Sequence, residues 1–413
     1  MTATKGMVIV GAGEAGARAA VELRDQGWSG AITLIGKEVQ PPYERPPLSK
    51  YVLTTDEAPE IKTILNDEQL ANQQIQSILG IPVHKIDSVN HQVHLVNGDS
   101  IGYERLLLAT GANPRRLMLN GEEPNGALYL RTYTDALDIR AHLQPNKHIV
   151  IIGAGFIGLE VAASARTRGC EVTVIEVGPR ILMRGVPVEI AEVIDARHRQ
   201  AGVNFKLGVG IKHIERRTDQ YQITLADETE VKCDTLIIGI GAVPETKLAE
   251  VSGLHLENGI AVNEQLITSD PDIFAAGDCC SFPHPLYGGK RIRLEAWRNA
   301  QDQATHAAIN MLGAQEAYRV VPWFWSDQYD LTLQVAGLSD AGTTTVKRGQ
   351  DNGDAIYFHL TDQGRILAAS AVGSPAIAKD IRLSEMLIEK HAIVDPQQLA
   401  DPSVKLKSIL QQL

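Results

Sequence analysis

Short apolar runs alternate along the chain with amphipathic, alanine-rich stretches, and one such unit occurs twice. Residues 7–16 read MVIVGAGEAG and residues 149–158 read IVIIGAGFIG. Each copy joins a β-branched run, a Gly-x-Gly-x-x-Gly turn and a stretch with helical periodicity, and a second apolar run follows at 31–36 and at 171–176. Strand, glycine turn, helix and strand in this order predict two Rossmann-type units.

The glycines of each turn have separate physical reasons. The first allows the tight turn from strand to helix, the second lets the backbone approach a pyrophosphate, and the third lets the helix pack against the strand. In the two copies these glycines are Gly11, Gly13 and Gly16, and Gly153, Gly155 and Gly158. The helix N-terminus adds free N–H groups and a partial positive charge. Each turn is therefore predicted to bind the phosphates of a dinucleotide.

The acidic residue that follows each unit differs between the copies. Glu176 ends the second strand of the second copy, at the position that hydrogen-bonds an adenosine ribose, and its charge would repel a 2′-phosphate. This favours NADH over NADPH, although the nearby Arg180 could weaken the preference. In the first copy the strand is followed by Lys37 and Glu38, and Glu38 is either the ribose ligand or a solvated loop acid.

Two further strands are expected to return to the Rossmann cores and to end in small residues, where backbone and dinucleotide come close. They are residues 105–114, with Ala109, Thr110 and Gly111, and residues 234–245, with Gly241 and Pro244. Asp278, in the segment TSDPDIFAAGDCC, could accept a hydrogen bond from a ribityl hydroxyl, sit near the pyrophosphate or cap a helix.

Composition narrows the class of protein. With 413 residues, 44% of them hydrophobic and 22% charged, the chain is long enough for two or three globular domains. A formal net charge of -11 disfavours nucleic acid as a partner. No apolar run is long enough to span a membrane. We also expect no metal site. The start of the chain, which enters a strand at Met7, leaves no room for a signal peptide, so we expect a cytoplasmic protein. For the oligomeric state, both a monomer and a homodimer are compatible with the sequence.

The cysteines do not form a redox or metal-binding pattern. Cys170, Cys233, Cys279 and Cys280 contain no Cys-x-x-Cys pair, and two neighbouring cysteines seldom suit a disulfide. We interpret them as reduced residues of the packed interior.

Several segments together carry a resemblance to a known family. They are PPYERPPLSK (41–50), GAGFIGLEVA (153–162), RIRLEAWRNA (291–300) and VPWFWSDQYD (321–330). With the two glycine turns, the ATG strand and the AGD strand, the chain resembles the two-dinucleotide-binding flavoproteins, and among them the ferredoxin reductases of bacterial oxygenase systems. The resemblance extends over essentially the whole chain.

The resemblance implies an α/β fold like that of glutathione reductase, with two Rossmann-like dinucleotide-binding domains and a C-terminal α+β domain. It implies an NADH:ferredoxin oxidoreductase that holds FAD and passes single electrons to a [2Fe–2S] ferredoxin, which serves a terminal oxygenase of the P450 or Rieske type. The order of motifs places the FAD domain at 1–113 and 247–320, the NAD domain at 114–246 and the C-terminal domain at 321–413.

The resemblance also implies a set of cofactor-binding residues. For FAD these are Gly11, Gly13, Ala15, Gly16, Lys37, Glu38, Arg45, Pro46, Lys50, Val83, Ala109, Thr110, Gly111, Arg131, Asp278, Glu295, Ala296, Trp297 and Trp325, with Trp323 as the alternative to the last. For NADH they are Gly153, Gly155, Ile157, Gly158, Glu160, Glu176 and Gly241. Lys37 departs from the acid that relatives usually carry at its position.

Lys50 and Glu160 are the implied catalytic residues, near the isoalloxazine and beside the nicotinamide. Lys50 would stabilise the charge of a reduced, anionic flavin. A simple ion pair between the two residues is the alternative, and it does not exclude the first interpretation.

The residues beyond Pro322 predict a small module of their own. Residues 331–338, 343–349, 355–360 and 365–372 are strand-like, with a hairpin turn at 362–364, and residues 374–391 predict an amphipathic helix that starts at Ser-Pro. On a strand, the spacing of Trp323 and Trp325 would place both indoles on one face, either for core packing or to cover the flavin or a partner.

Three other functions are alternatives to electron transfer to a ferredoxin. A disulfide reductase needs a cysteine pair after the flavin loop, and an NADH oxidase or peroxidase needs a cysteine near the flavin. Residues 41–50 contain none, and position 49 is serine. A redox-sensing flavoprotein is disfavoured because no basic surface or targeting segment is recognisable.

Overall fold

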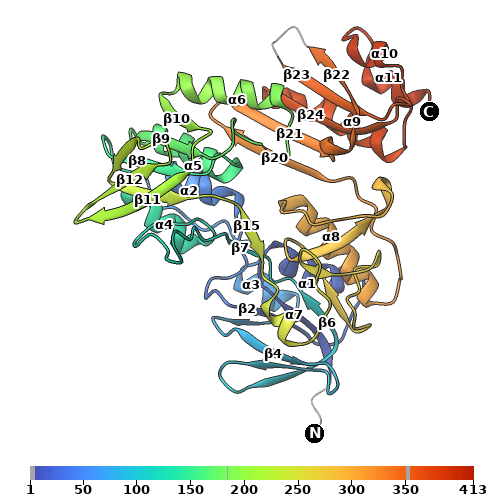
Figure 1. Ribbon diagram of the computed structural model, residues 1–413. Helices are drawn as coiled ribbons and strands as arrows, with labels where there is room; N and C mark the ends of the chain where they lie inside the picture. The colour runs from blue at the N-terminus through green and yellow to red at the C-terminus, as the bar shows by residue number, and fades with distance from the viewer. Residues whose placement is uncertain (1–4, 184, 350–353) are drawn as a thin grey trace. The chain divides into compact units, whose positions relative to one another are not determined.

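The computed structural model describes residues 5–183, 185–349 and 354–413. The polar residues 1–4, on which the expectation about a signal peptide rests, lie outside this range. The described chain divides into two compact units. Unit 1 consists of the residues up to Glu44, Ile61–Asn113 and Val243–Val320, and unit 2 consists of Arg45–Glu60, Pro114–Ala242 and Val321–Leu413. Figure 1 colours the chain by residue number.

The helices and strands of unit 1 come from three separate stretches of the chain. They are β1 (Gly6–Val10), α1 (Glu14–Asp25), β2 (Ile32–Gly36), α3 (Asp67–Asn72), β3 (Ile75–Leu79), β4 (Val83–Asp87), β5 (Gln92–Leu95), β6 (Ser100–Leu108), α7 (Lys247–Val251), β16 (Ile260–Ala261), β17 (Ile273–Ala275), β18 (Cys280–His284), η2 (Pro285–Tyr287), β19 (Lys290–Ile292) and α8 (Trp297–Met311).

A mostly parallel sheet forms the core of unit 1. Its strand order is β3-β2-β1-β6-β5-β4, and β17 pairs with β6. Strands β2, β1 and β6 run parallel, so that Val10 lies between Ile35 and Leu108, whereas β5 and β4 return antiparallel. Every residue of β1 is buried, as an uninterrupted apolar run predicts for a strand covered on both faces. Helices α1 and α8 pack against each other beside this sheet.

Unit 2 contains a second Rossmann unit and the C-terminal module. Its first elements are η1 (Pro46–Ser49), α2 (Tyr51–Thr54), α4 (Tyr133–His142), β8 (His148–Ile152), α5 (Phe156–Thr167), β9 (Glu171–Glu176), α6 (Val188–Gln200), β10 (Val203–Leu207), β11 (Ile211–Arg217), β12 (Gln220–Leu225), β13 (Glu230–Cys233) and β14 (Thr235–Ile238). Strands β10, β9, β8 and β14 form a parallel sheet in that order, and β11, β12 and β13 form an antiparallel one. The short strands β7 (Ala112–Pro114) and β15 (Ala242–Pro244) form a two-stranded sheet.

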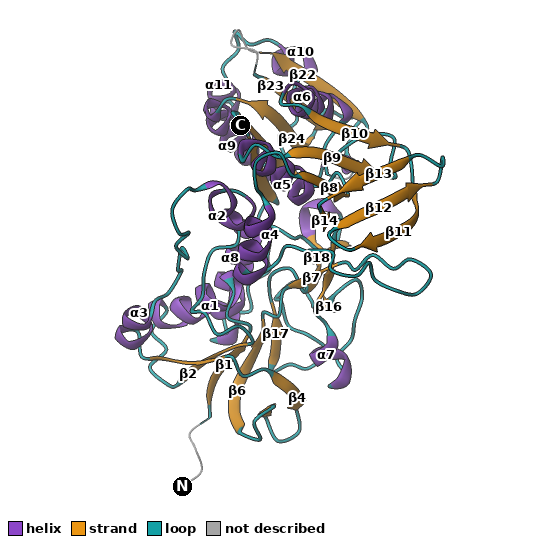
Figure 2. Ribbon diagram, turned by 90° about the vertical axis from the view of Figure 1, so that its left-hand side faces the viewer, coloured by secondary structure: helices purple, strands orange, loops and turns teal. Residues whose placement is uncertain are grey.

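The C-terminal module is an antiparallel sheet covered by helices. Its elements are β20 (Trp323–Gln328), β21 (Leu331–Gly337), η3 (Ser339–Ala341), β22 (Thr344–Gly349), β23 (Ala355–Leu360), β24 (Ile366–Gly373), η4 (Pro375–Ile377), α9 (Ala378–Glu389), α10 (Pro396–Ala400) and α11 (Leu406–Gln411). The strand order is β20-β21-β24-β23-β22, and α9 packs against β21 and β24. Figure 2 shows α9 beside β24. The expected α+β composition of this module is thereby confirmed.

Three sequence predictions need correction in detail. Residues 291–297 (RIRLEAW), which the sequence predicts to be one strand, are not a strand throughout, because β19 ends at Ile292 and Trp297 already begins α8. The helix expected from residue 374 starts as the 3-10 turn η4 and becomes α-helical at Ala378. Asp278 does not cap a helix, because β18 follows it.

The four cysteine side chains lie in the interior of the protein. The cysteines are unpaired and buried, which confirms the packing interpretation. Burial raises the pKa of the Cys279 and Cys280 thiols, so that they stay protonated. Among the described residues, no helix is both long enough and apolar enough to cross a lipid bilayer.

Candidate active site

The first glycine turn is shaped by close backbone contacts on two sides. Gly11 has φ +117°, and a Cβ there would clash with the carbonyl oxygen of Ala109. A Cβ on Gly16 would clash with the carbonyl oxygen of Gly11. At Gly13, by contrast, a Cβ would meet no protein atom within 4 Å. Packing within the protein therefore explains the first and third glycines but not the second.

The helices that follow both turns begin without a side-chain cap. Gly13 is the N-cap of α1 and Gly155 the N-cap of α5, and neither helix start has a capping side chain. A Cβ on Gly155 would also meet no protein atom within 4 Å. Uncapped N–H groups at a helix start, with room beside the backbone, suit a pyrophosphate. The described residues thus fit the phosphates of FAD in unit 1 and of NADH in unit 2.

Other predicted flavin residues of unit 1 gather around the first turn. Thr110 Oγ1 donates to the Glu245 carbonyl oxygen at 2.6 Å, which fixes the end of β6. A Cβ on Gly277 would lie 3.2 Å from Cβ of Ala15, so the turn that carries Asp278 lies against the glycine turn. The strand that begins near residue 105 thus returns to the Rossmann sheet beside β1, as the sequence predicts.

The other residues of unit 1 that are predicted to contact the flavin lie on several different elements. Lys37 is exposed, Val83 begins β4, and Ala296 caps α8 just before Trp297. Glu295 pairs with Arg293 at 2.6 Å. Glu38 accepts a hydrogen bond from the Tyr43 hydroxyl at 2.5 Å and is half-buried, so it is not simply a solvated loop acid.

Glu176 is fixed over the second glycine turn. Its carboxylate accepts hydrogen bonds from the backbone N–H groups of Ala154, at 2.9 Å, and Gly178, at 2.8 Å. Each oxygen keeps a lone pair for a ribose hydroxyl. The nearby Arg180 guanidinium donates to the carbonyl oxygens of Ile181, Leu182 and Val186 and is therefore already engaged. Ile157, in the first turn of α5, is 49% exposed.

Glu160 is the centre of a buried polar cluster in unit 2. Its side chain is 4% exposed, and Lys50 Nζ lies 2.9 Å from Oε2, so the two residues do form the ion pair that was the alternative interpretation, with its carboxylate buried within unit 2. Ser49 donates to the same oxygen at 2.5 Å, and Ser326 donates to Oε1 at 2.6 Å. Helix α5 supplies Glu160, η1 supplies Ser49, and β20 supplies Ser326. The carboxylate is thereby fixed by three separate segments of the chain.

The segment before Lys50 is anchored within unit 2. Ser164 on α5 donates to the carbonyl oxygen of Ser49 at 2.7 Å, which holds η1 against the helix. Arg45 Nη1 donates to the Arg131 carbonyl oxygen at 2.6 Å, bringing together two residues predicted to contact FAD. Pro46 begins η1, and its carbonyl oxygen lies 3.4 Å from Nζ of Lys50.

Strand β20 presents two different faces. Trp323 and Trp325 stack with ring centroids 5.3 Å apart, which confirms that both indoles share a face. Both are half-buried, so this face is not simply core. On the opposite face, the ring of Phe324 makes an edge-to-face contact with the ring of Phe156 on α5, with centroids 5.1 Å apart. Ser326, on this same face, donates its hydrogen bond to Glu160.

Two members of the Glu160 cluster, Ser49 and Ser326, could not be predicted as its partners from sequence. Both lie within the motifs at 41–50 and 321–330, but no local pattern links a hydroxyl to a carboxylate more than a hundred residues away. Such a pair is formed only by the tertiary fold.

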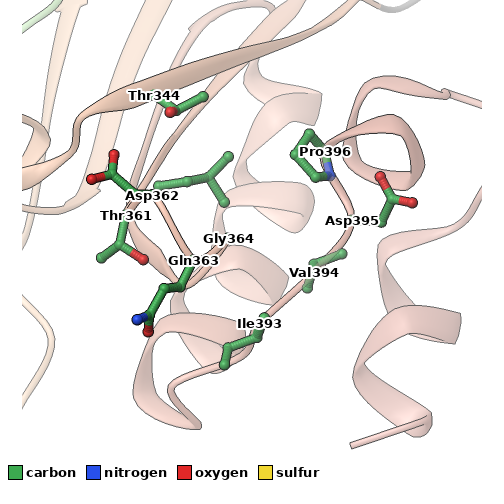
Figure 3. Close-up of a pocket in the computed structure, with 10 residues that line it drawn as sticks. Thr344, Thr361, Asp362, Gln363, Gly364, Ile393, Val394, Asp395 and Pro396 are labelled. Carbon is green, nitrogen blue, oxygen red and sulfur yellow. The ribbon is translucent and has the colours of Figure 1, made fainter.

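The C-terminal module also contains a shallow pocket, shown in Figure 3. Its two carboxylates already have structural roles: Asp362 accepts a hydrogen bond from Thr343, and Asp395 caps α10 through the Gln397 N–H. The pocket therefore brings together loop residues rather than chemically available groups.

The fold and site define a class. Two Rossmann units in one chain, each with an uncapped, glycine-lined helix start, are typical of oxidoreductases that bind a flavin and a nicotinamide dinucleotide.

Comparison with known proteins identifies the family within this class. Residues 5–304 match the family model of pyridine nucleotide-disulphide oxidoreductases, and residues 323–410 match the reductase C-terminal family. The chain is 40% identical to the ferredoxin–NAD(+) reductase component of the anthranilate 1,2-dioxygenase system of Burkholderia cepacia, over 98% of both chains. It is also 40% identical to a rubredoxin–NAD(+) reductase of Pseudomonas putida, over 89% of this chain and 96% of that one.

A solved structure agrees over the full length. The reductase in the covalent putidaredoxin reductase–putidaredoxin complex aligns with a TM-score of 0.92 and 36% identity, over 100% of this chain and 99% of that one. The chain belongs to the pyridine nucleotide-disulphide oxidoreductases and, among them, to the ferredoxin–NAD(+) reductases. It is an oxidoreductase that uses FAD and NAD(H), which confirms the resemblance, the fold class and the cofactors predicted from sequence.

Proposed function

We propose that the chain transfers a hydride from NADH to FAD and passes the electrons singly to a [2Fe–2S] ferredoxin, which supplies a terminal oxygenase. The observation that carries this proposal is the similarity over 98% of both chains to the reductase component of a dioxygenase system. FAD supplies the chemistry, because it accepts two electrons as a hydride and releases them one at a time. The protein binds and orients the two dinucleotides.

In this proposal the residues of unit 1 hold the FAD phosphates and ribityl chain. The N–H groups at the start of α1 bind the pyrophosphate, and Gly13 allows its close approach. Asp278 accepts a hydrogen bond from a hydroxyl of the cofactor. The other FAD residues named from sequence, and the domain limits at 113, 246 and 320, belong to the same proposal. It is supported by the contacts around Gly11 and Ala15.

Lys50 and Glu160 act at the reactive end of the dinucleotides in this proposal. The Lys50 ammonium provides a positive charge that stabilises the negative charge of a reduced flavin. Glu160 keeps this ammonium in place through the 2.9 Å ion pair and lies beside the nicotinamide.

NADH rather than NADPH is the proposed substrate. Glu176 would hydrogen-bond the hydroxyls of the adenosine ribose and repel a 2′-phosphate. Three hydrogen bonds to backbone carbonyl groups hold the Arg180 guanidinium, so only two of its five N–H groups remain to bind such a phosphate. Both features favour NADH.

The electrons are proposed to leave for another protein rather than for a disulfide. The segment 41–50 contains no cysteine, and the residue beside Lys50 is Ser49, whose hydroxyl is bonded to Glu160. A thiol relay therefore has no candidate in this segment. We also propose a cytoplasmic location, where NADH is available and thiols stay reduced.

Steady-state kinetics with purified, FAD-loaded protein test the proposal. NADH-dependent reduction of cytochrome c should be slow with the reductase alone and should rise by at least about tenfold when a [2Fe–2S] ferredoxin is added. A rubredoxin, a disulfide and hydrogen peroxide serve as the competing acceptors. The proposal is wrong if one of these is reduced faster than every [2Fe–2S] ferredoxin tried.

A further inference from the structure

A buried chain of hydrogen bonds leads from Glu160 into the C-terminal module and on to α6. Ser326 donates to Glu160 Oε1 at 2.6 Å, and Gln328 Nε2 donates to Ser326 Oγ at 3.0 Å. His198 Nε2 lies 2.7 Å from Gln328 Oε1. Ser326 and Gln328 are each 1% exposed and His198 is 0% exposed. Buried side chains from three elements are thus joined in one network.

The ends of the network determine its direction. An ionised carboxylate only accepts hydrogen bonds, so the Ser326 hydroxyl proton points to Glu160 and its oxygen accepts from Gln328. The amide oxygen of Gln328 can only accept, which places the proton of neutral His198 on Nε2. Burial lowers the pKa of His198 to about 4, so that this ring is neutral near neutral pH. Its Nδ1 is then the acceptor for the Tyr329 hydroxyl at 3.4 Å.

The network is built to orient groups rather than to conduct protons. The Gln328 amide interrupts any proton relay, because its nitrogen does not readily take up and release a proton at neutral pH. A polarised chain of donors does fix the rotamers of its members. Ser49 holds Oε2 of Glu160 and Ser326 holds Oε1, so the carboxylate cannot rotate freely about its last bond.

We propose that Ser326, oriented by Gln328 and His198, is a positioning residue for hydride transfer. It fixes the Glu160 carboxylate, and through it the Lys50 ammonium, in the orientation that the reaction requires. This inference rests on the proposed function, in which Glu160 and Lys50 act beside the nicotinamide and the flavin. In this proposal Ser326 and Gln328, in the motif at 321–330, act on other residues of the same chain.

Single-turnover reduction tests the inference independently of any acceptor protein. FAD-loaded enzyme is mixed with excess NADH without oxygen, and the bleaching of flavin absorbance gives a rate constant at saturating NADH. Ser326→Ala should lower this rate constant by about tenfold, the effect of losing one hydrogen bond to a charged group. FAD content and the apparent dissociation constant of NADH should stay within about twofold of the starting protein.

A conservative variant and a matched variant separate positioning from packing. Ser326→Thr keeps the hydroxyl on a strand that tolerates β-branching and should restore most of the rate. Ser370→Ala removes another buried hydroxyl from the same sheet, one that contacts His359 instead of Glu160, and should leave the rate unchanged.

A double-mutant cycle tests whether Ser326 acts through Glu160. In the Glu160→Gln background, Ser326→Ala should change the rate by less than about twofold, because the group to be positioned is already altered. An undiminished tenfold effect in that background would overturn the proposal, as would a normal rate for Ser326→Ala alone. Because the readout stops at the reduced flavin, these results do not depend on which protein takes the electrons.

Discussion

The Lys50 ammonium lies 2.9 Å from Oε2 of Glu160, whose side chain is only 4% exposed. The pair formed by Lys62 and Glu44 has the same 2.9 Å separation, but its glutamate is 21% exposed, and its lysine is 66% exposed against 27% for Lys50. Water screens the exposed pair, whereas a buried carboxylate that loses its cation keeps the cost of its own desolvation. Equal distances therefore do not imply equal contributions to stability.

Replacing the two lysines should separate these cases. Lys50→Met should lower the free energy of unfolding by about 2 kcal/mol, and Lys62→Met by less than about 0.5 kcal/mol. Urea denaturation measures both. Adding Glu160→Gln to Lys50→Met should recover most of the loss, because the buried charge is then removed as well. Equal effects of the two lysine variants would contradict this account.

The two kinds of glycine in the first turn should respond differently to alanine. Gly13→Ala adds a methyl group that meets no protein atom, at a φ of -90° that alanine adopts freely, so the apoprotein should keep its stability. Its dissociation constant for FAD should rise by about tenfold or more, because the methyl group keeps the pyrophosphate away. Gly16→Ala should instead destabilise the apoprotein by about 3 kcal/mol, through its clash with the Gly11 carbonyl oxygen. Thermal unfolding of apoprotein and fluorescence titration with FAD distinguish the two.

Glu176 should affect NADH without affecting FAD. Glu176→Ala removes the carboxylate that accepts from Ala154 and Gly178, and should raise KM for NADH by about tenfold while bound FAD stays in place. Glu171→Ala, at the exposed opposite end of β9, is the matched control and should leave KM unchanged. Loss of FAD from the Glu176 variant would mean that the two dinucleotide sites have been assigned the wrong way round.

Arg348 should be a main anchor of the C-terminal helices. It is 5% exposed, and its guanidinium donates to the carbonyl oxygens of Leu399, Asp401, Pro402 and Val404. Arg348→Met leaves these carbonyl groups without their donor and should cost about 3 kcal/mol. Hydrogen exchange should then accelerate selectively in residues 396–411. The exposed Arg382, replaced in the same way, should have little effect.

Two buried histidines should make the protein less stable in mild acid. The pKa values of His198 and His284 are lowered to about 4 by burial. In the unfolded chain they titrate near 6.5, so between these values the unfolded state binds protons that the folded state does not. The free energy of unfolding is therefore highest above about pH 6.5. It should fall by about 2 kcal/mol per histidine between pH 7 and pH 5. Urea midpoints at the two pH values measure this loss, and His198→Asn should reduce it. An equally steep loss in that variant would show that other groups are responsible.

Local sequence patterns were sufficient for the Rossmann units and insufficient for the cluster around Glu160. Apolar runs and glycine spacing predict β1, α1, β8 and α5, because burial and turn geometry act over a few residues. The start of α8 was missed because its N-cap, Ala296, offers no capping side chain to recognise. Ser49 and Ser326 could be identified as motif residues, but their shared acceptor depends on how η1, α5 and β20 pack, which local spacing does not encode.

The alternation of β20 constrains how this protein can diverge. Trp323, Trp325 and Asp327 occupy one face of the strand, and Phe324, Ser326 and Gln328 occupy the other. Inserting or deleting one residue within β20 would exchange the faces, bringing an indole towards Glu160 and a serine to the outer surface. Length changes should therefore be tolerated before Trp323 but not within the strand. A chimera that borrows the C-terminal module of a relative should need a compatible partner for Gln328 at position 198 as well.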